Sequence, residues 1–116
     1  MSKVDLLAPI RKLLSVRKRW CQEHAAVSSK GLPIDPHSPK AVAWCLMGAC
    51  DKAYRLDSDT FRLVDRELDR RSRELGASSD VTFNDDGKRK HSEIKELLRD
   101  PFYGPAPSAN HSTNQE

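Results

Sequence analysis

The feature that most limits the fold of this chain is the apolar run at residues 41–50, AVAWCLMGAC. A run without a polar face belongs in a protein interior. Ser38 and Pro39 precede it, and serine at a cap followed by proline at the first helical position favours a helix start. We therefore predict a central, buried helix from Ser38 to about Tyr54. Gly48 within it costs about 1 kcal/mol relative to alanine, so we expect another backbone to approach closely there.

The N-terminal segment has the apolar spacing of a second helix. Pro9 is tolerated in a first turn but bends a helix interior, so this helix begins near Ala8, or begins near Ser2 and bends. We expect it to end within residues 24–26 and residues 27–37 to form a loop. Its apolar residues recur every three or four positions: Leu6, Leu7, Ile10, Leu13, Leu14, Trp20 and Cys21.

Two more helices are predicted after the central one. Residues 57–58 can cap the third helix and Gly76 can end it. Residues 81–83 are expected to be extended, and the Asn84–Asp85 turn to cap a last helix over residues 88–99. The third helix has a narrow apolar stripe formed by Phe61, Val64, Leu68 and Leu75.

These segments predict an all-α fold, a compact four-helix domain over residues 1–103 with the apolar helix at its centre. Residues 104–116, GPAPSANHSTNQE, contain no large apolar side chain and are predicted to be a disordered tail. No apolar run approaches the ~20 residues that a membrane helix needs. Pro9, Arg11 and Lys12 also interrupt the apolar stretch of a signal peptide. We therefore expect a cytoplasmic protein without membrane contact.

The cysteines favour neither a disulfide framework nor a metal site. Their number, three, is odd, which is typical of reduced core residues rather than of a secreted scaffold. The potential zinc ligands lack the close paired spacing of a structural zinc site. No metal or cofactor is therefore predicted. The potential ligands are Cys21, His24, Cys45, Cys50 and His91.

The candidate polar site consists of Asn84, Asp85 and His91. A carboxylate beside a histidine can orient it as a general base, and Cys45 would then be a nucleophile. The alternative is architectural: Asp85 caps a helix and His91 is half-buried. In that case the turn can also accept a hydrogen bond from the indole N–H of Trp20 or Trp44 and hold the fold together. The sequence contains no phosphate loop, GxGxxG, HExxH or GxSxG motif, so no catalytic residue is predicted.

Two basic clusters are candidate contacts for anions or nucleic acid. The second cluster is expected at a helix N-terminus, where backbone amides also favour anions. The net charge is only +3, and acidic residues are interleaved with basic ones, so a solvated surface is the alternative. The clusters are Arg11, Lys12, Arg17, Lys18 and Arg19, and then Lys88, Arg89 and Lys90.

Three blocks of the sequence resemble an uncharacterised family of small helical domains found in bacteria and their phages. They are Trp-Cys-Gln at residues 20–22 with Gly-Leu-Pro at 31–33, the run at 41–49, and the Phe-Asn-Asp turn at 83–85 with the helix that follows it. The resemblance implies an all-helical fold and a bacterial or phage origin, and it implies no activity, cofactor or catalytic residue. The family more often has tryptophan where this chain has Phe83.

The sequence therefore leaves the function unknown and supports three expectations. The first is a non-enzymatic module that binds another protein. The second is a nucleic-acid-associated protein that uses residues 11–19 and 88–90. The third is an enzyme or small-ligand binder with a site at Asn84, Asp85 and His91. The absence of enzyme motifs favours the first, and the oligomeric state stays open.

Overall fold

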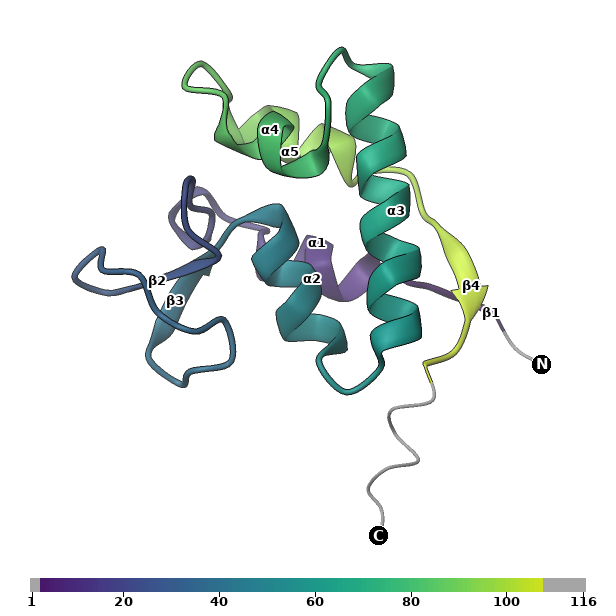
Figure 1. Ribbon diagram of the computed structural model, residues 1–116, viewed down its shortest axis with the longest axis horizontal. Helices are drawn as coiled ribbons and strands as arrows, with labels where there is room; N and C mark the ends of the chain where they lie inside the picture. The colour runs from purple at the N-terminus through teal and green to yellow at the C-terminus, as the bar shows by residue number, and fades with distance from the viewer. Residues whose placement is uncertain (1–2, 108–116) are drawn as a thin grey trace, which may run out of the picture.

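The longest element of the computed structural model, which describes residues 3–107, is helix α3, Ser58–Glu74. It begins as predicted, because the Asp57 carboxylate caps it by accepting a hydrogen bond from the Thr60 N–H at 3.0 Å. Val64 and Leu68 bury its apolar stripe. Helix α2 packs on one half of α3, and helices α4 and α5 pack at its other end (Figure 1).

The apolar run at 41–50 is divided between a strand and a helix. Strand β3, Ala41–Trp44, pairs antiparallel with β2, Ala26–Ser28, and helix α2, Leu46–Tyr54, begins only after it. Cys45 caps α2, and its Sγ accepts a hydrogen bond from the Gly48 N–H at 3.2 Å. The prediction of a helix from residue 38 is therefore wrong over its first half. An all-round apolar run suits a buried strand as well as a buried helix, and here the partner strand decides between them.

The expected close approach at Gly48 is present. A Cβ at this position would overlap the backbone carbonyl of Ala25, which also accepts the Cys45 N–H at 3.1 Å. Only glycine therefore allows the segment before β2 to cross the first turn of α2.

The N-terminal helix is shorter than predicted. Helix α1, Ala8–Leu13, has Pro9 in its first turn, where proline is tolerated. The chain then becomes extended at Val16, forms a single 3₁₀ turn at Arg17–Arg19 and continues extended through Trp20. Trp20 forms a parallel bridge with Trp44, so the end of the predicted helix lies beside β3 instead.

The segment after α3 also differs from the prediction. Residues 81–83 are helical, within α4, Asp80–Asp85, which Ser79 caps by accepting a hydrogen bond from the Thr82 N–H at 3.1 Å. The last helix, α5, His91–Leu97, begins three residues after the predicted start at 88. The Asn84–Asp85 turn therefore ends one helix rather than capping the next.

The two ends of the described chain form a second small sheet. Strand β1, Lys3–Asp5, pairs antiparallel with β4, Tyr103–Pro105. Residues 104 and 105, which we assigned to the tail, thus belong to a strand, and Gly104 is buried against Leu6. Residues 108–116 of the predicted tail lie outside the described residues.

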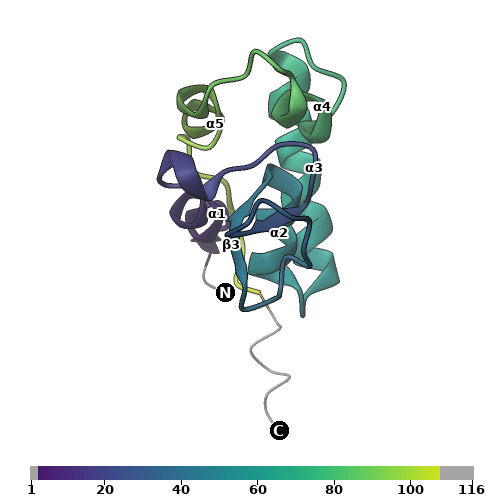
Figure 2. The same ribbon diagram turned by 90° about the vertical axis from the view of Figure 1, so that its left-hand side faces the viewer.

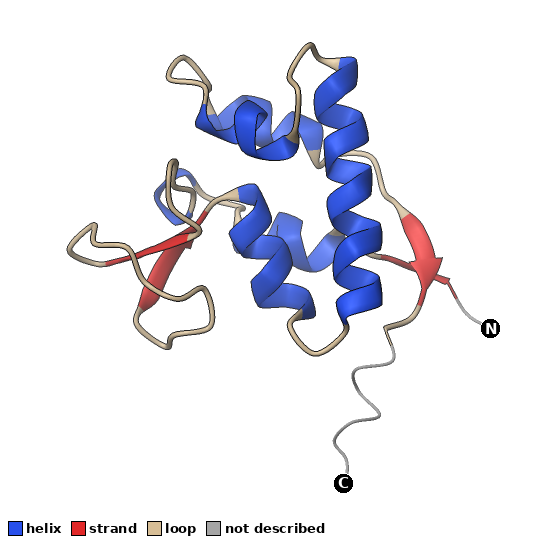
Figure 3. Ribbon diagram, in the orientation of Figure 1, coloured by secondary structure: helices blue, strands red, loops and turns tan. Residues whose placement is uncertain are grey.

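The fold is mixed α/β, so the prediction of an all-α four-helix bundle is wrong. Over residues 3–107 it contains five α-helices, one 3₁₀ turn and four short strands in two separate sheets. Figure 3 shows the β2–β3 sheet and the β1–β4 sheet on opposite sides of the helices. None of the helices in this part of the chain is long and apolar enough to span a membrane. The largest buried core side chains include some from every α-helix and from the residues that flank α1 and α5: Leu6, Leu7, Ile10, Leu14, Leu46, Val64, Leu68, Phe83, Ile94 and Leu98.

Candidate functional site

Asn84, one of the predicted site residues, is saturated with hydrogen bonds inside the protein. Its Oδ1 accepts hydrogen bonds from the Trp20 indole N–H at 2.8 Å and from the Leu46 backbone N–H at 3.1 Å. Its Nδ2 donates to the Cys21 carbonyl at 3.1 Å and to the Asp85 carboxylate at 2.8 Å. Asn84 is 1% exposed, so these four bonds, which we call the Asn84 latch, join three distant segments in the core.

The neighbours of Asn84 extend the latch to the surface. The Asp85 carboxylate accepts a hydrogen bond from the Glu23 N–H at 2.9 Å, and Glu23 has a left-handed backbone with φ +72°. The Gln22 amide donates to the carbonyls of Asn84 and Asp86 at 2.9 and 2.8 Å. The segment 20–23 and the end of α4 are thereby fixed against each other. The expected indole bond to this turn is present, and its donor is Trp20.

Among the described residues, no hydrogen bond or ion pair joins His91 to Asp85. The Nε2 of His91 is 2.7 Å from the Leu14 carbonyl, and its ring centroid is 6.0 Å from that of Trp20. Burial raises the pKa of the Cys45 thiol, which keeps it protonated. The Cys45 Sγ also accepts the hydrogen bond from the Gly48 N–H that caps α2. Burial likewise raises the pKa of Cys21 to about 12. A thiol held protonated is a poor nucleophile, so the residues of the predicted site do not form a cysteine–histidine pair.

The cysteines and histidines do not form a metal centre either. In residues 3–107, no group of three or more His, Cys, Asp or Glu side chains is placed to hold a metal ion. All three cysteines are free thiols, and Cys45 and Cys50 are buried. Their burial agrees with the role of small core residues.

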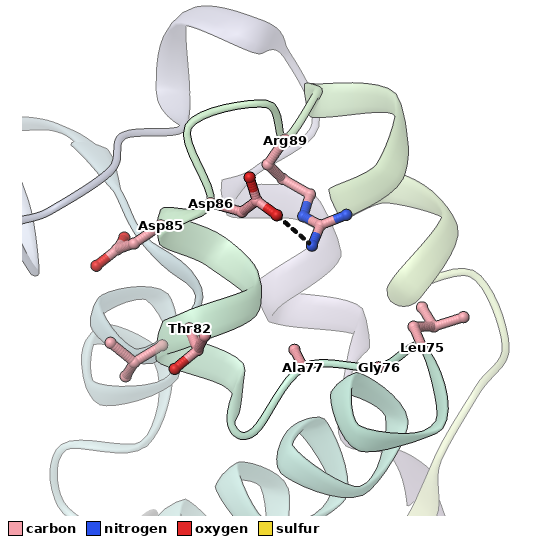
Figure 4. A pocket seen from close by; sticks show the side chains of 8 residues that line it. Leu75, Gly76, Ala77, Thr82, Asp85, Asp86 and Arg89 are labelled. Atoms are coloured by element: carbon pink, nitrogen blue, oxygen red, sulfur yellow. Dashed lines mark ion pairs between the residues drawn. The ribbon is translucent and has the colours of Figure 1, made fainter.

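A pocket of about 520 Å³ lies beside the Asn84 latch, where the loop after α3 meets α4. We call it the corner pocket. Figure 4 shows Leu75, Gly76 and Ala77 along one side, Thr82 and Asp85 on α4 along another, and Arg89 across from the loop. Of the three predicted polar-site residues, only Asp85 lines it, and the Asn84 side chain is buried in the core.

Arg89 is held rigidly at the corner pocket. Its guanidinium lies 3.6 Å from the Phe83 ring centroid, and its Nε donates to the Phe83 carbonyl at 2.7 Å. Its terminal nitrogens have only long ion pairs, 3.6 Å to Asp86 and 3.4 Å to Glu93. Stacking on Phe83 and the hydrogen bond to its carbonyl fix the position of the guanidinium. The terminal N–H groups can still donate hydrogen bonds to a ligand.

The structure divides the predicted basic clusters. Arg11 faces α5, where its Nε donates to the Leu98 carbonyl and its Nη1 pairs with Asp5, both at 3.0 Å. Lys12 and Arg19 line a different hollow together with Lys52. Among the second cluster Arg89 points inward, and Lys88 and Lys90 are exposed. Arg11 and Arg89 thus donate hydrogen bonds to backbone carbonyls of the protein, which leaves fewer free cations for a nucleic-acid backbone.

Sequence reasoning missed a buried acidic cluster between α3 and α4. Asp80, the first residue of α4, is 3% exposed, and its N–H donates to the Asp69 carboxylate at 2.7 Å. Asp65 and Ser72 lie on the same face of α3 as Asp69. In the sequence, these carboxylates resemble the exposed charged residues on either side of them. The only available signal was the presence of Ser72 in the apolar stripe, three positions before Leu75.

Comparison with known proteins gives one match. The model of a family of unknown function (DUF6197) matches residues 1–100. No curated protein and no solved structure matches the chain. An uncharacterised family was expected from the resemblance, whereas the bacterial or phage origin that it implied stays a prediction.

Proposed function

We propose that this chain, which belongs to the family of unknown function DUF6197, is a non-enzymatic module that binds another protein at the corner pocket. The observation that carries the proposal is the apolar mouth of this pocket. Leu75 is 62% exposed and Val81 is 42% exposed, on the two elements that enclose it. Single exposed apolar residues are ordinary, but two at the mouth of one pocket offer apolar area that a partner can bury.

The mixed chemistry of the corner pocket suits a polypeptide. Asp85 and Asp86 offer carboxylate acceptors, and Arg89 offers N–H donors, in the same pocket as the apolar side chains of Leu75 and Val81. A peptide segment brings both carbonyl acceptors and N–H donors together with apolar side chains. Two carboxylates and one guanidinium line the pocket, which leaves its lining net negative, so charge complementarity favours a segment with a large apolar side chain next to lysine or arginine.

The rigidity of the pocket supports the same function. The Asn84 latch fixes α4, and the stacked Arg89 fixes the opposite wall, so a partner would not have to order these groups on binding. Pre-organisation of this kind lowers the entropic cost of association. The enzyme alternative has no comparable support, because His91 bonds to the Leu14 carbonyl instead of Asp85 and the Cys45 thiol is held protonated.

Pull-down with matched surface variants tests the proposal. The parent protein, Leu75→Asp and Val81→Asp would be used as baits after nuclease treatment, with Leu56→Asp as the control. Leu56 is 66% exposed but lies in the turn between α2 and α3, outside the corner pocket. We expect one protein to bind the parent and the control in a defined ratio and to be lost from both pocket variants.

Two results would contradict the proposal. One is a partner that binds the pocket variants as well as it binds the parent. The other is binding that disappears on nuclease treatment and falls steeply with salt, which would favour the nucleic-acid alternative at the basic clusters. Circular dichroism of each variant excludes misfolding as the cause of lost binding.

A further inference from the structure

The buried acidic cluster brings four polar side chains to one interface between α3 and α4. Asp65, Asp69 and Ser72 follow one face of α3, and Asp80 faces them from the first position of α4. The Asp80 carboxyl group lies within hydrogen-bonding reach of the carboxyl groups of Asp65 and Asp69. Figures 1 and 2 show α4 beside the C-terminal half of α3, with which it is in contact.

If every carboxyl group of this cluster is ionised, some of its buried oxygens lack a hydrogen-bond donor. Three side-chain oxygens of the cluster are buried and have no hydrogen-bond partner among residues 3–107. They are Asp80 Oδ2, Asp65 Oδ1 and Ser72 Oγ. An ionised carboxylate can only accept hydrogen bonds. Two ionised carboxylates facing each other in the core would be strongly unfavourable. One proton between Asp80 and Asp65 supplies the missing donor.

The groups that face Asp80 favour the neutral form. Asp65 and Asp69 approach from α3, and the thiols of Cys45 and Cys50 approach from α2 and its cap. These neighbours are acids, and no cation is among the main influences on Asp80. Burial, followed by the hydrogen bond and charge of Asp65, raises the pKa of Asp80 to about 9.

We propose that Asp80 and Asp65 share one buried proton that holds α4 against α3, and that loss of this proton to solvent releases α4. The consequence for partner binding rests on the proposed function, because α4 carries Val81 and Asp85 of the corner pocket. Release also breaks the Asn84 latch, since Asn84 belongs to α4 and accepts the Trp20 indole N–H. Trp20 therefore reports on the state of α4.

Tryptophan fluorescence tests the release of α4 directly. The chain has two tryptophans, so Trp44→Phe leaves Trp20 as the only one. We expect its emission to shift reversibly to longer wavelength as the pH rises from 6 to 10, while the rest of the protein stays folded. The shift should be absent when Asp80→Asn is added. The control Asp59→Asn removes a carboxylate that is 91% exposed on α3, the helix that carries Asp65, and should keep the shift.

Denaturant unfolding gives a second readout in the protein with both tryptophans, in case Trp44→Phe does not fold. The native state keeps a proton that the unfolded state loses above about pH 4, so the unfolding equilibrium constant of the parent should rise by up to about tenfold per pH unit between pH 5 and 8. The constant of Asp80→Asn should change much less over this range. Equal pH dependence in the parent and in Asp80→Asn would overturn the proposal.

The two proposals fail in different measurements. Fluorescence and unfolding need no partner, so an unshifted Trp20 emission up to pH 10 rejects the shared proton and leaves the docking site standing. A partner that ignores Leu75→Asp and Val81→Asp at pH 7 rejects the docking site and leaves the shared proton standing.

Discussion

Replacing Asn84 by alanine should destabilise the protein more than any other single change at the turn. The substitution removes the acceptor of two buried donors, the Trp20 indole N–H and the Leu46 backbone N–H. Each buried donor left unpaired costs about 1–3 kcal/mol. Because Asn84 is 1% exposed and Trp20 is 4% exposed, water cannot replace the lost acceptor without opening the core. We therefore expect a loss of about 3–4 kcal/mol in the free energy of unfolding.

This loss is large against the ~5–15 kcal/mol of a typical domain. It corresponds to a melting temperature lower by about 10 °C or more for a chain of this size. Urea unfolding followed by circular dichroism measures it, and an unchanged dependence on denaturant would show that the native state stays intact. A loss below about 1 kcal/mol would refute the assignment of Asn84 as a latch.

A double-mutant cycle with Trp20→Phe isolates the indole bond. Trp20→Phe removes the donor, so Asn84→Ala should cost less in that background than in the parent. We expect the difference to be about 1 kcal/mol or more, as for side chains within one buried network. Strictly additive losses would mean that the 2.8 Å contact contributes nothing to stability.

Three further outcomes are expected. Gly48→Ala should lower stability by more than about 2 kcal/mol in thermal unfolding, because the added methyl group would overlap the Ala25 carbonyl; a neutral result would contradict the close approach. Arg71→Ala should lower the free energy of unfolding by about 2–3 kcal/mol in urea, because Arg71 donates hydrogen bonds to the carbonyls of residues 97, 100 and 101. The control Arg62→Ala removes an exposed side chain and should change this free energy by less than about 0.5 kcal/mol. Hydrogen bonds from Arg70 and Arg71 hold the pKa of Glu67 below its usual value. The stability that Glu67 contributes should therefore be present at neutral pH and be lost as the pH falls below about 4.5. Unfolding measured against pH would contradict this if Glu67→Gln kept the acid dependence of the parent.

Helix α3 could be predicted from the sequence because its signals are local. Asp57 provides the cap, Gly76 follows the end, and the stripe between them has one period throughout. Even here one residue was misplaced: Leu75 is exposed, and Ser72 occupies the buried position. The C-cap changes the direction of the chain at Leu75, so the helical period no longer applies there.

The strand β3 and the helix α4 could not be predicted, for two different reasons. The segment AVAW contains no polar position that would reveal an alternating pattern, and its pairing with residues 26–28 is a contact distant in sequence. In α4, Val81, Thr82 and Phe83 favour a strand by propensity, but the Ser79 cap and the burial of Phe83 and Asn84 favour one turn and a half of helix. Tertiary contacts outweigh propensity in both segments.

The candidate site was partly accessible from sequence. The Asn84–Asp85 turn was identified because polar turn residues between apolar segments stand out, and the indole was the natural buried donor for it. The corner pocket was not, because its walls, residues 75–77 and the end of α4, meet only through the packing of α4 on α3. The Asp80 cluster was hidden for a similar reason, since Asp65 and Asp69 resemble the solvated residues on either side of them.

The pairing of the two ends of the described chain determines how the domain responds to force. Lys3 is paired with Pro105, so a pull applied to both ends loads partners that lie directly opposite each other. The load then acts on the β1–β4 pairs one at a time, from Lys3 and Pro105 to Asp5 and Tyr103, instead of on all of them in parallel. The small sheet therefore resists tension weakly. Strong resistance to the pull is first met at Leu6, because its N–H donates to the Phe102 carbonyl at 2.9 Å and its side chain is fully buried.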